Sequence, residues 1–370
     1  MREPKINPWR IIWKTLLVLL VVNFVYPWLK VPNFSAISLY NSVFPGRQRL
    51  PFGENPGLSY NLTLDDINAM FDSHRIAAAD ATAEYSIVLI GDSSIWGTLL
   101  ENDQTIAARL QAIVDSHLST RDEPTRIYNL GYPTISVLKD LVIVDQALRY
   151  EPDMVIWFVT LNSLVKNSYK DAPIVLNNPE KANAVINKYA LDIGELPQQN
   201  YWERTFINQR RSIYDRIHLQ LLAPMWVSTG IDQYVPEEFS PAARDLDADD
   251  AYEGIAGDSI SEGDLDISVI ANFIEKNPDV EVIVVNEPIL ISTGENSEIR
   301  YNLYYPRWAF DSYREFLSTK FAEMEIQYID LWDAVPEFLF TNSAIHYTEQ
   351  GVDIVSEKIY SFIEKDLRSK

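Results

Sequence analysis

The stretch YSIVLIGDSS, residues 85–94, joins an apolar run directly to a glycine, an acid and two serines. Its first six residues are typical of a strand that is buried on both faces of a parallel sheet. Similar runs recur at residues 126–130, 154–160, 280–285 and 327–331. Helix-like patterns lie between or after them, at residues 105–118, 137–148, 267–276, 307–324 and beyond 348. This alternation predicts a doubly wound parallel sheet of five strands with helices on both faces.

Composition excludes several classes of protein. The 370 residues are 47% hydrophobic, enough for a sizeable core, and carry 53 acidic against 31 basic residues, a formal charge of −22. Such a chain repels phosphate backbones, so we expect no nucleic-acid partner. It has no cysteine, which excludes disulfides, zinc–thiolate sites, iron–sulfur clusters and thiol nucleophiles. We predict neither a metal nor a cofactor, and the sequence identifies no protein partner.

The N-terminus has the pattern of a membrane anchor. Residues 11–29 are almost wholly apolar and, at about 1.5 Å per residue, just span a hydrocarbon core. Lys14 lies one turn inside and can snorkel to the headgroups. Both ends carry aromatic residues typical of interfacial belts, and basic residues precede the span: Trp9, Trp13, Tyr26 and Trp28, and Arg2, Lys5 and Arg10. We therefore predict an uncleaved single-pass anchor with the remainder of the chain on the extracytoplasmic side. A cleaved signal peptide and a buried core helix are the alternatives, although no A-x-A-like site follows.

Three segments follow from these patterns. Residues 1–30 are the anchor, residues 31–80 a turn-rich connector with a possible short helix at 64–71, and residues 81–370 an α/β domain with an insertion at about 165–265. The insertion holds a basic, aromatic stretch at 201–226 and then an acidic tract at 236–266, with eleven Asp or Glu and a single Arg. We expect this tract to be a solvated, mobile loop. A calcium site is the weaker alternative, because the acidic residues lack the spacing of a calcium-binding loop.

Ser93 is the first candidate for chemistry. It follows the opening strand at its carboxyl end, where open α/β sheets place their ligand sites. A strand-to-helix turn or a helix cap explains a serine there equally well. The same Gly-Asp-Ser triplet recurs at residues 257–259, where no strand precedes it and a plain turn is expected.

Three further residues stand at comparable places. Gly131 follows the second strand and could present its backbone N–H to a ligand, or simply form a turn. Asn162 follows the third strand and could donate its side-chain N–H to an oxyanion, or cap the next helix. His346 precedes the final helix, where a general base could be held. Two of the other histidines, His74 and His117, lie in polar and apparently exposed settings, and His218 is expected to be a surface or core residue.

Together, the four blocks around Ser93, Gly131, Asn162 and His346 resemble the SGNH hydrolase superfamily, also called GDSL-type esterases and lipases, over residues 85–165 and 325–365. The resemblance implies a flavodoxin-like three-layer α/β/α sandwich. It also implies that Ser93 is the nucleophile and His346 the general base. The backbone N–H groups of Ser93 and Gly131, with the side chain of Asn162, would form the oxyanion hole.

The sequence departs from that superfamily at two places. The Asp expected three residues before the histidine is Ser343 here, and the third block lacks the usual Gly-x-Asn-Asp form. Asn342 could accept the imidazole N–H instead, as in Cys-His-Asn sites. Asp330 or Asp333 could also fold back to do so, or a backbone carbonyl could hold His346 as part of a Ser–His dyad.

The resulting hypothesis is an extracytoplasmic, membrane-anchored serine esterase or O-acyltransferase acting on acyl esters of cell-surface glycans or lipids, a class that the resemblance implies for anchored bacterial members. The alternatives are a catalytically degenerate binding or scaffolding module of the cell envelope, and a structural subunit of a membrane assembly. Aromatic residues of the insertion could stack on sugar rings or fill a helix core: Tyr201, Trp202, Tyr214 and Trp226.

Overall fold

The computed structural model describes residues 7–29, 46–51, 67–79, 83–117, 124–166, 172–229, 238–252, 255 and 259–369. Its five strands are β1 (Tyr85–Ile90), β2 (Thr125–Asn129), β3 (Met154–Val159), β4 (Glu281–Asn286) and β5 (Gln327–Asp330). The longer helices are α1 (Pro8–Val25), α5 (Ile106–His117), α6 (Val137–Ala147), α9 (Pro179–Lys188), α10 (Phe206–Thr229), α11 (Ser268–Lys276), α12 (Arg307–Glu323) and α13 (Glu349–Ser369). Short helical segments are η1 (Tyr26–Trp28), α3 (Ile67–Ser73), η3 (Arg75–Ala78), α4 (Ser93–Trp96), η4 (Asn102–Gln104), η5 (Leu148–Tyr150), α7 (Leu161–Leu164), α8 (Pro173–Asn177) and η8 (Glu337–Leu339).

The five strands form one sheet in the order β2-β1-β3-β4-β5, and every pair is parallel. This is the strand order of flavodoxin-like folds. Strands β1 and β3 lie in the middle and are buried at every residue, which explains why their sequences are apolar without alternation. The predicted five-stranded parallel sheet is confirmed, and the predicted strand ends differ from the observed ones by at most one residue.

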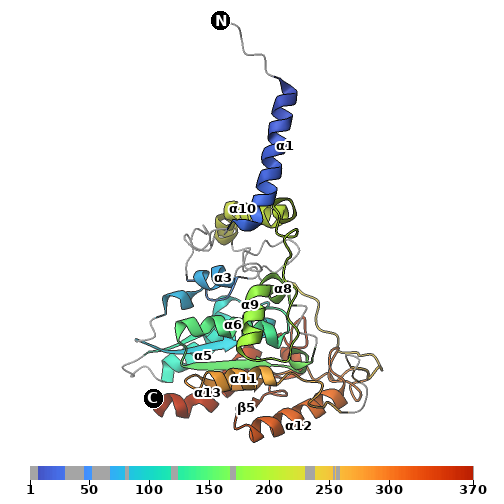
Figure 1. Ribbon diagram of the computed structural model, residues 1–370. Helices are drawn as coiled ribbons and strands as arrows, with labels where there is room; N and C mark the ends of the chain where they lie inside the picture. Colours follow the sequence, from blue (N-terminus) through green and yellow to red (C-terminus); the bar gives the residue numbers. More distant parts are fainter. Residues whose placement is uncertain are drawn as a thin grey trace.

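Helices cover both faces of the sheet, which gives three layers (Figure 1). On one face, α5 and α13 pack against the side chains of Ile87, Leu89 and their neighbours in the sheet. On the other face, α6, α9, α11 and α12, together with α3, cover a larger cluster that includes Val88 and Trp157. Alternate residues of one strand therefore belong to different cores, as the two-residue period of a strand requires. The predicted three-layer α/β/α sandwich is confirmed.

Helix α1 lies apart from these layers. It projects from the domain (Figure 1), and its apolar side chains are exposed, including Trp9, Trp13 and Leu17. Within Pro8–Trp28, a window of 18 residues has a mean hydropathy of 1.7. Within the described part of the chain, this is the one helix long and apolar enough to cross a membrane. The structure thus excludes a buried core helix here, whereas a signal sequence has the same length and composition.

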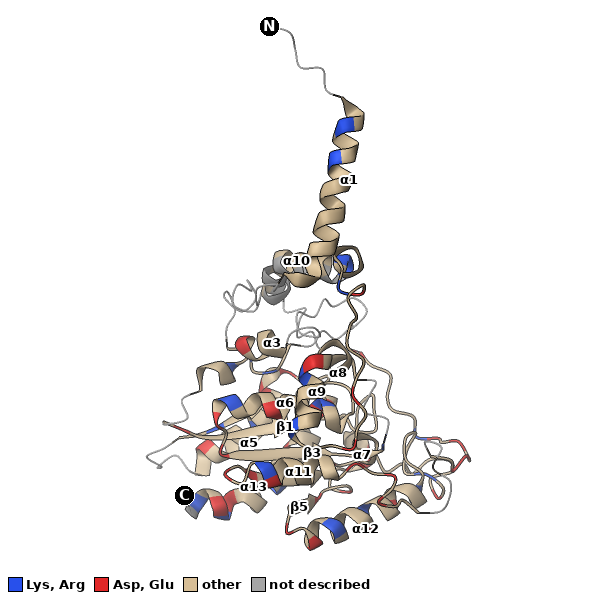
Figure 2. Ribbon diagram, in the orientation of Figure 1, with Lys and Arg blue, Asp and Glu red and all other residues tan. Residues whose placement is uncertain are grey.

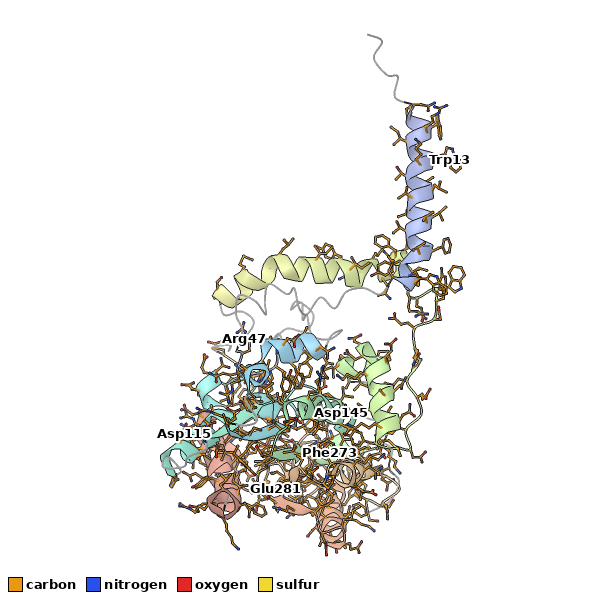
Figure 3. The ribbon with its side chains drawn as sticks, turned by 60° about the vertical axis from the view of Figure 1, so that its left-hand side comes forward. Trp13, Arg47, Asp115, Asp145, Phe273 and Glu281 are labelled. Carbon is orange, nitrogen blue, oxygen red and sulfur yellow. The ribbon has the colours of Figure 1, made fainter. Side chains whose placement is uncertain are left out.

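The insertion contains helices that the sequence analysis did not place. Helices α8 and α9 pack on α6, and α10 lies crosswise at the foot of α1, between α1 and the α/β domain (Figure 3). Of the connector at 31–80, residues 31–45, 52–66 and 80 are outside the described residues. The predicted helix at 64–71 is observed from Ile67 as α3, with buried core side chains.

Two expectations are corrected. The described part of the acidic tract is not a simple solvated loop, because Leu246, Tyr252 and Leu265 are buried between its acidic residues. His74 is also buried rather than exposed: its Nε2 lies 3.0 Å from the carbonyl oxygen of Gln48, and burial lowers its pKa to about 3. His117 is exposed, as expected. The side chain of His218 and most of the second Gly-Asp-Ser, at 257–258, lie outside the described residues.

Candidate active site

Ser93 stands at the first position of α4, three residues beyond the end of β1. Asp92 caps this helix, since its carboxylate accepts the backbone N–H of Ser94 at 2.8 Å. The turn is tight: a Cβ on Gly91 would lie 2.5 Å from Cγ1 of Ile95, so a glycine is required there. Ser93 is half-buried while its neighbours Asp92 and Ser94 are buried. The turn therefore presents one serine at the carboxyl edge, meaning the edge of the sheet at which all five strands end.

His346 reaches the same place from the other end of the chain. Its Nε2 lies 2.7 Å from Oγ of Ser93, a hydrogen bond between residues 253 positions apart. The loop that carries it is fixed by backbone hydrogen bonds from Thr341 to the carbonyl oxygen of His346 and from Thr348 to that of Leu339, both 2.8 Å. The structure thus brings together the predicted nucleophile and the predicted base.

Asn342 occupies the far side of the imidazole. Its Oδ1 lies 2.8 Å from Nδ1 of His346. An amide oxygen only accepts hydrogen bonds, so Nδ1 carries the proton and Nε2 is left to accept the hydroxyl proton of Ser93. Asp330, one of the alternatives, accepts hydrogen bonds from Arg314 and Asn286 instead. Among the described contacts of Nδ1, the amide of Asn342 therefore takes the place of a carboxylate.

Burial lowers the pKa of His346, and the negative charge of Asp92 opposes that shift in part. The imidazole is consequently neutral at pH 7, the state in which a histidine can take a proton from a serine. An uncharged partner such as Asn342 orients the ring without stabilising the imidazolium.

The three predicted oxyanion donors have different surroundings. Ser93 is the first residue of α4, so its N–H has no carbonyl within that helix to bond. Asn162 lies in α7, and its Oδ1 accepts the hydroxyl of Tyr252 from the acidic tract, a contact that fixes the orientation of the amide. Sequence reasoning missed Tyr252, because nothing in the sequence links it to a residue 90 positions earlier.

Gly131 packs closely against the nucleophile turn but its N–H is already engaged. A Cβ at this position would lie 2.5 Å from the backbone nitrogen of Trp96, so only glycine fits. The N–H of Gly131 donates to Oδ1 of Asn129 at 3.1 Å, and the amide of Asn129 donates to the carbonyl oxygen of Ile95 at 2.8 Å. The structure thus gives this glycine a packing role, with its N–H used within its own turn.

A buried acid, Glu287, supports the nucleophile turn from the end of β4. The hydroxyl of Ser94 donates to its Oε2, and the hydroxyl of Tyr347 lies 3.3 Å from the same oxygen. Burial, with the nearby charge of Asp92, raises the pKa of Glu287 well above its usual value. The position of Glu287 in the sequence could have indicated a place in the site, since it directly follows the fourth strand as Ser93 and Asn162 follow theirs.

A fully buried lysine joins the first two turns. The ammonium group of Lys139 in α6 donates to the carbonyl oxygens of Gly91 (2.8 Å) and Tyr132 (2.7 Å), and it pairs with Asp140 at 2.7 Å. Burial raises the pKa of Asp140 to about 6, against the opposing effect of Lys139. In the sequence, the sign of this buried pair is a Lys-Asp dipeptide within the apolar pattern at 137–148.

Within the described residues, no group of three or more His, Asp or Glu side chains has a metal-binding arrangement.

No protein-family model matches this chain, and no curated protein matches it by sequence. Among solved structures it is similar to a lipase/acylhydrolase from Enterococcus faecalis, at 14% identity over 76% of this chain and 96% of that one, with a TM-score of 0.38. It is also similar to Axe2, an acetylxylan esterase from Geobacillus stearothermophilus (11% identity, 76% and 94% covered, TM-score 0.38). A third is the psychrotrophic esterase EstA from Pseudoalteromonas sp. (11% identity, 77% and 100% covered, TM-score 0.37). The activities in these names belong to those proteins.

Proposed function

We propose that this chain is a membrane-anchored serine esterase or O-acyltransferase that acts on acyl esters of cell-surface glycans or lipids. The observation that carries the proposal is the 2.7 Å hydrogen bond between Oγ of Ser93 and Nε2 of His346, with Asn342 on the other ring nitrogen. A nucleophile, a base and an orienting group in this relation are what acyl transfer through a serine needs.

Each residue has a distinct part in the proposed reaction. His346 takes the hydroxyl proton as Oγ of Ser93 attacks the ester carbonyl, and the tetrahedral intermediate carries its negative charge on the former carbonyl oxygen. The N–H of Ser93 and the amide of Asn162 stabilise that charge, and losing one such donor costs about 10²–10³ in rate. Collapse breaks the bond to the alcohol, which leaves with the proton from His346, and the acyl group stays on Ser93.

The second half of the reaction decides between the two activities. If water attacks the acyl-serine, with His346 again taking a proton, the product is a free acid and the chain is an esterase. If a hydroxyl of a glycan or lipid attacks, the acyl group is transferred. The exposed helix α1 supports the anchored part of the proposal, and the basic residues before it favour an extracytoplasmic domain.

The test is covalent labelling of the full chain by a fluorophosphonate probe, followed by turnover of p-nitrophenyl acetate. We expect the probe to label the native protein and not Ser93→Ala. Loss of the nucleophile should reduce kcat by about 10⁶-fold, or to the rate of uncatalysed hydrolysis if that is higher. Ser116→Ala, an exposed hydroxyl on α5, is the matched control.

The second candidate is a binding module of the cell envelope that has lost turnover. The neutral Asn342 and the engaged N–H of Gly131 favour it, because both reduce the catalytic power of the site. A native protein that neither reacts with the probe nor hydrolyses the ester would establish this alternative in place of the esterase.

A further inference from the structure

Helix α10 is attached to the last turn of α1. The backbone N–H of Ile207 donates to Oδ1 of Asn23 at 2.8 Å, and the hydroxyl of Tyr201 donates to the carbonyl oxygen of Phe24 at 2.7 Å. Asn23, a polar residue within an apolar helix, is buried by this contact. Since α1 ends at Val25, α10 begins at the level where the apolar helix stops.

Aromatic rings strengthen the same junction. Phe24 meets Trp202 at 6.0 Å, Tyr26 meets Phe206 at 5.6 Å and Trp28 meets Tyr201 at 6.2 Å between ring centroids. Tyr and Trp are enriched where a membrane meets water, because their rings are apolar and their tips polar. Two of the aromatic residues considered for sugar stacking, Tyr201 and Trp202, thus pack on α1.

One side of α10 carries apolar side chains that are exposed to solvent. We call these the α10 stripe: Ile207, Tyr214, Ile217, Leu221 and Met225, which are between 44% and 71% exposed. At about 100° per residue, all five fall within roughly 80° around the helix axis, and the exposed Arg210 lies in the same arc near the start of the helix. Apolar side chains on one side of a helix are normally buried. We therefore expect another apolar surface to cover the stripe.

The orientation of α10 relative to α1 indicates which surface covers the stripe. It runs crosswise to α1 and lies between α1 and the α/β domain (Figures 1 and 3). A helix that crosses the end of a membrane span runs along the plane of the membrane. Its sequence has three Arg and one Asp, in contrast to the formal charge of −22 for the whole chain. In Figure 2, the described basic residues of this region lie near the junction with α1. Apolar residues with arginines on one helix are typical of binding to a bilayer surface.

We propose that α10 is an interfacial helix whose stripe inserts into the surface of the phospholipid bilayer that α1 crosses. This inference rests on the membrane anchoring in the proposed function and is independent of the esterase activity. The helix would hold the α/β domain at the membrane by a second contact, besides the chain connection after α1.

The absence of cysteine makes a direct test possible, since one introduced cysteine accepts one label. Leu221→Cys and Met225→Cys, both at exposed positions, are labelled with the environment-sensitive dye NBD in the full chain, reconstituted in phosphatidylcholine vesicles. The matched controls are Val18→Cys in the middle of α1 and Met324→Cys at the exposed end of α12, far from α1 (Figure 1).

We expect blue-shifted emission at Leu221 and Met225, quenched by lipids that carry a spin label near the headgroup. Val18 should be quenched best by a label deep in the acyl chains, and Met324 by neither. Water-like emission at Leu221 and Met225, with Val18 quenched, would overturn the interfacial helix and would indicate a protein partner for the stripe. Loss of quenching at Val18 as well would overturn the anchor. Fluorophosphonate labelling of the same samples reports separately on the esterase proposal.

Discussion

The two members of the Ser93–His346 pair lie in different surroundings. Beneath Ser93 are four ionisable side chains that are almost completely buried: Asp92, Lys139, Asp140 and Glu287. Beside His346 is a single neutral amide, Asn342, which is exposed to solvent. These buried ionisable groups hold the turn of the predicted nucleophile in place, whereas the predicted base has one side-chain partner that orients its ring. A firmly held nucleophile turn and a base stabilised by a neighbouring charge are therefore separate properties, and the predicted site of this chain shows the first without the second.

The largest expected effect comes from breaking the nucleophile side. Lys139→Met leaves Asp140 buried without its cation and removes one hydrogen-bond donor from each of two backbone carbonyls. We expect the free energy of unfolding to fall by about 3–5 kcal/mol at pH 8. The fall should be smaller at pH 5, where Asp140, with a pKa of about 6, is neutral. Denaturant titration of the full chain in detergent, followed by tryptophan fluorescence, measures this.

The double variant Lys139→Met/Asp140→Leu is the control for that experiment, because it removes both charges. It should recover most of the lost stability. A single variant as stable as the native protein would show that the buried pair does not support the turn.

Breaking the base side should affect catalysis and leave stability nearly unchanged. Asn342→Ala removes the acceptor on Nδ1, so the imidazole loses its preferred tautomer and orientation. We expect kcat for p-nitrophenyl acetate to fall by about 10²-fold, less than the roughly 10⁴-fold seen when a charged triad partner is replaced. An unchanged kcat would mean that another group orients His346.

Asn342→Asp sharpens the comparison by adding the missing charge. A general base works when neutral, so kcat/KM rises with pH through the pKa of His346. Burial places that pKa below its usual value in the native protein. A carboxylate beside the ring favours the imidazolium and should raise the pKa of His346, which moves the acid limb of the profile to higher pH. The pH dependence of kcat/KM for both proteins is the measurement, and coincident acid limbs would contradict the assignment.

The smallest expected effect concerns backbone strain at Thr134, in the loop that follows β2. Thr134, in the loop between β2 and α6, has a φ of 83°, a left-handed conformation that is costly for a β-branched residue. Thr134→Gly should raise the free energy of unfolding by about 0.5–1 kcal/mol, since relief of strain exceeds the entropy that glycine loses. Thr134→Ala keeps a Cβ and should gain less, so equal stabilities of the two variants would argue against strain.

The sheet could be predicted from the sequence because its signal is local. Each buried strand is an apolar run ended by turn residues, and the observed bounds follow those runs closely. The positions of Ser93, Asn162 and His346 were also predictable, since each directly follows a strand or precedes the last helix. Their roles as catalytic groups stay a prediction. Helix α10 was not placed, because the residues of the α10 stripe are exposed and arginines lie among them in the sequence, a pattern that a search for core-facing helices does not detect.

The supporting groups of the site could not be predicted, for a physical reason. The contacts of Lys139 with Gly91 and Tyr132, and of Glu287 with Ser94, depend on how distant segments pack. The sequence shows such a residue only as a polar position in an apolar pattern or after a strand, and its role is recognised only from its partners. The same holds for Tyr252, whose hydrogen bond to Asn162 required the acidic tract to fold over the carboxyl edge. The choice of Asn342 among several possible partners of His346 likewise needed coordinates.

The hydrogen bonds from Tyr201 and Ile207 to the foot of α1 have a mechanical consequence. A domain joined to a membrane by a single linker can rotate and move toward or away from the membrane, whereas a domain attached at two points keeps one orientation. If α1 crosses the membrane and α10 lies on its surface, as proposed, the height of Ser93 above the lipid would be fixed. If the proposed esterase activity is present, the protein would then select its ester by the distance of that ester from the membrane, as well as by its chemical identity.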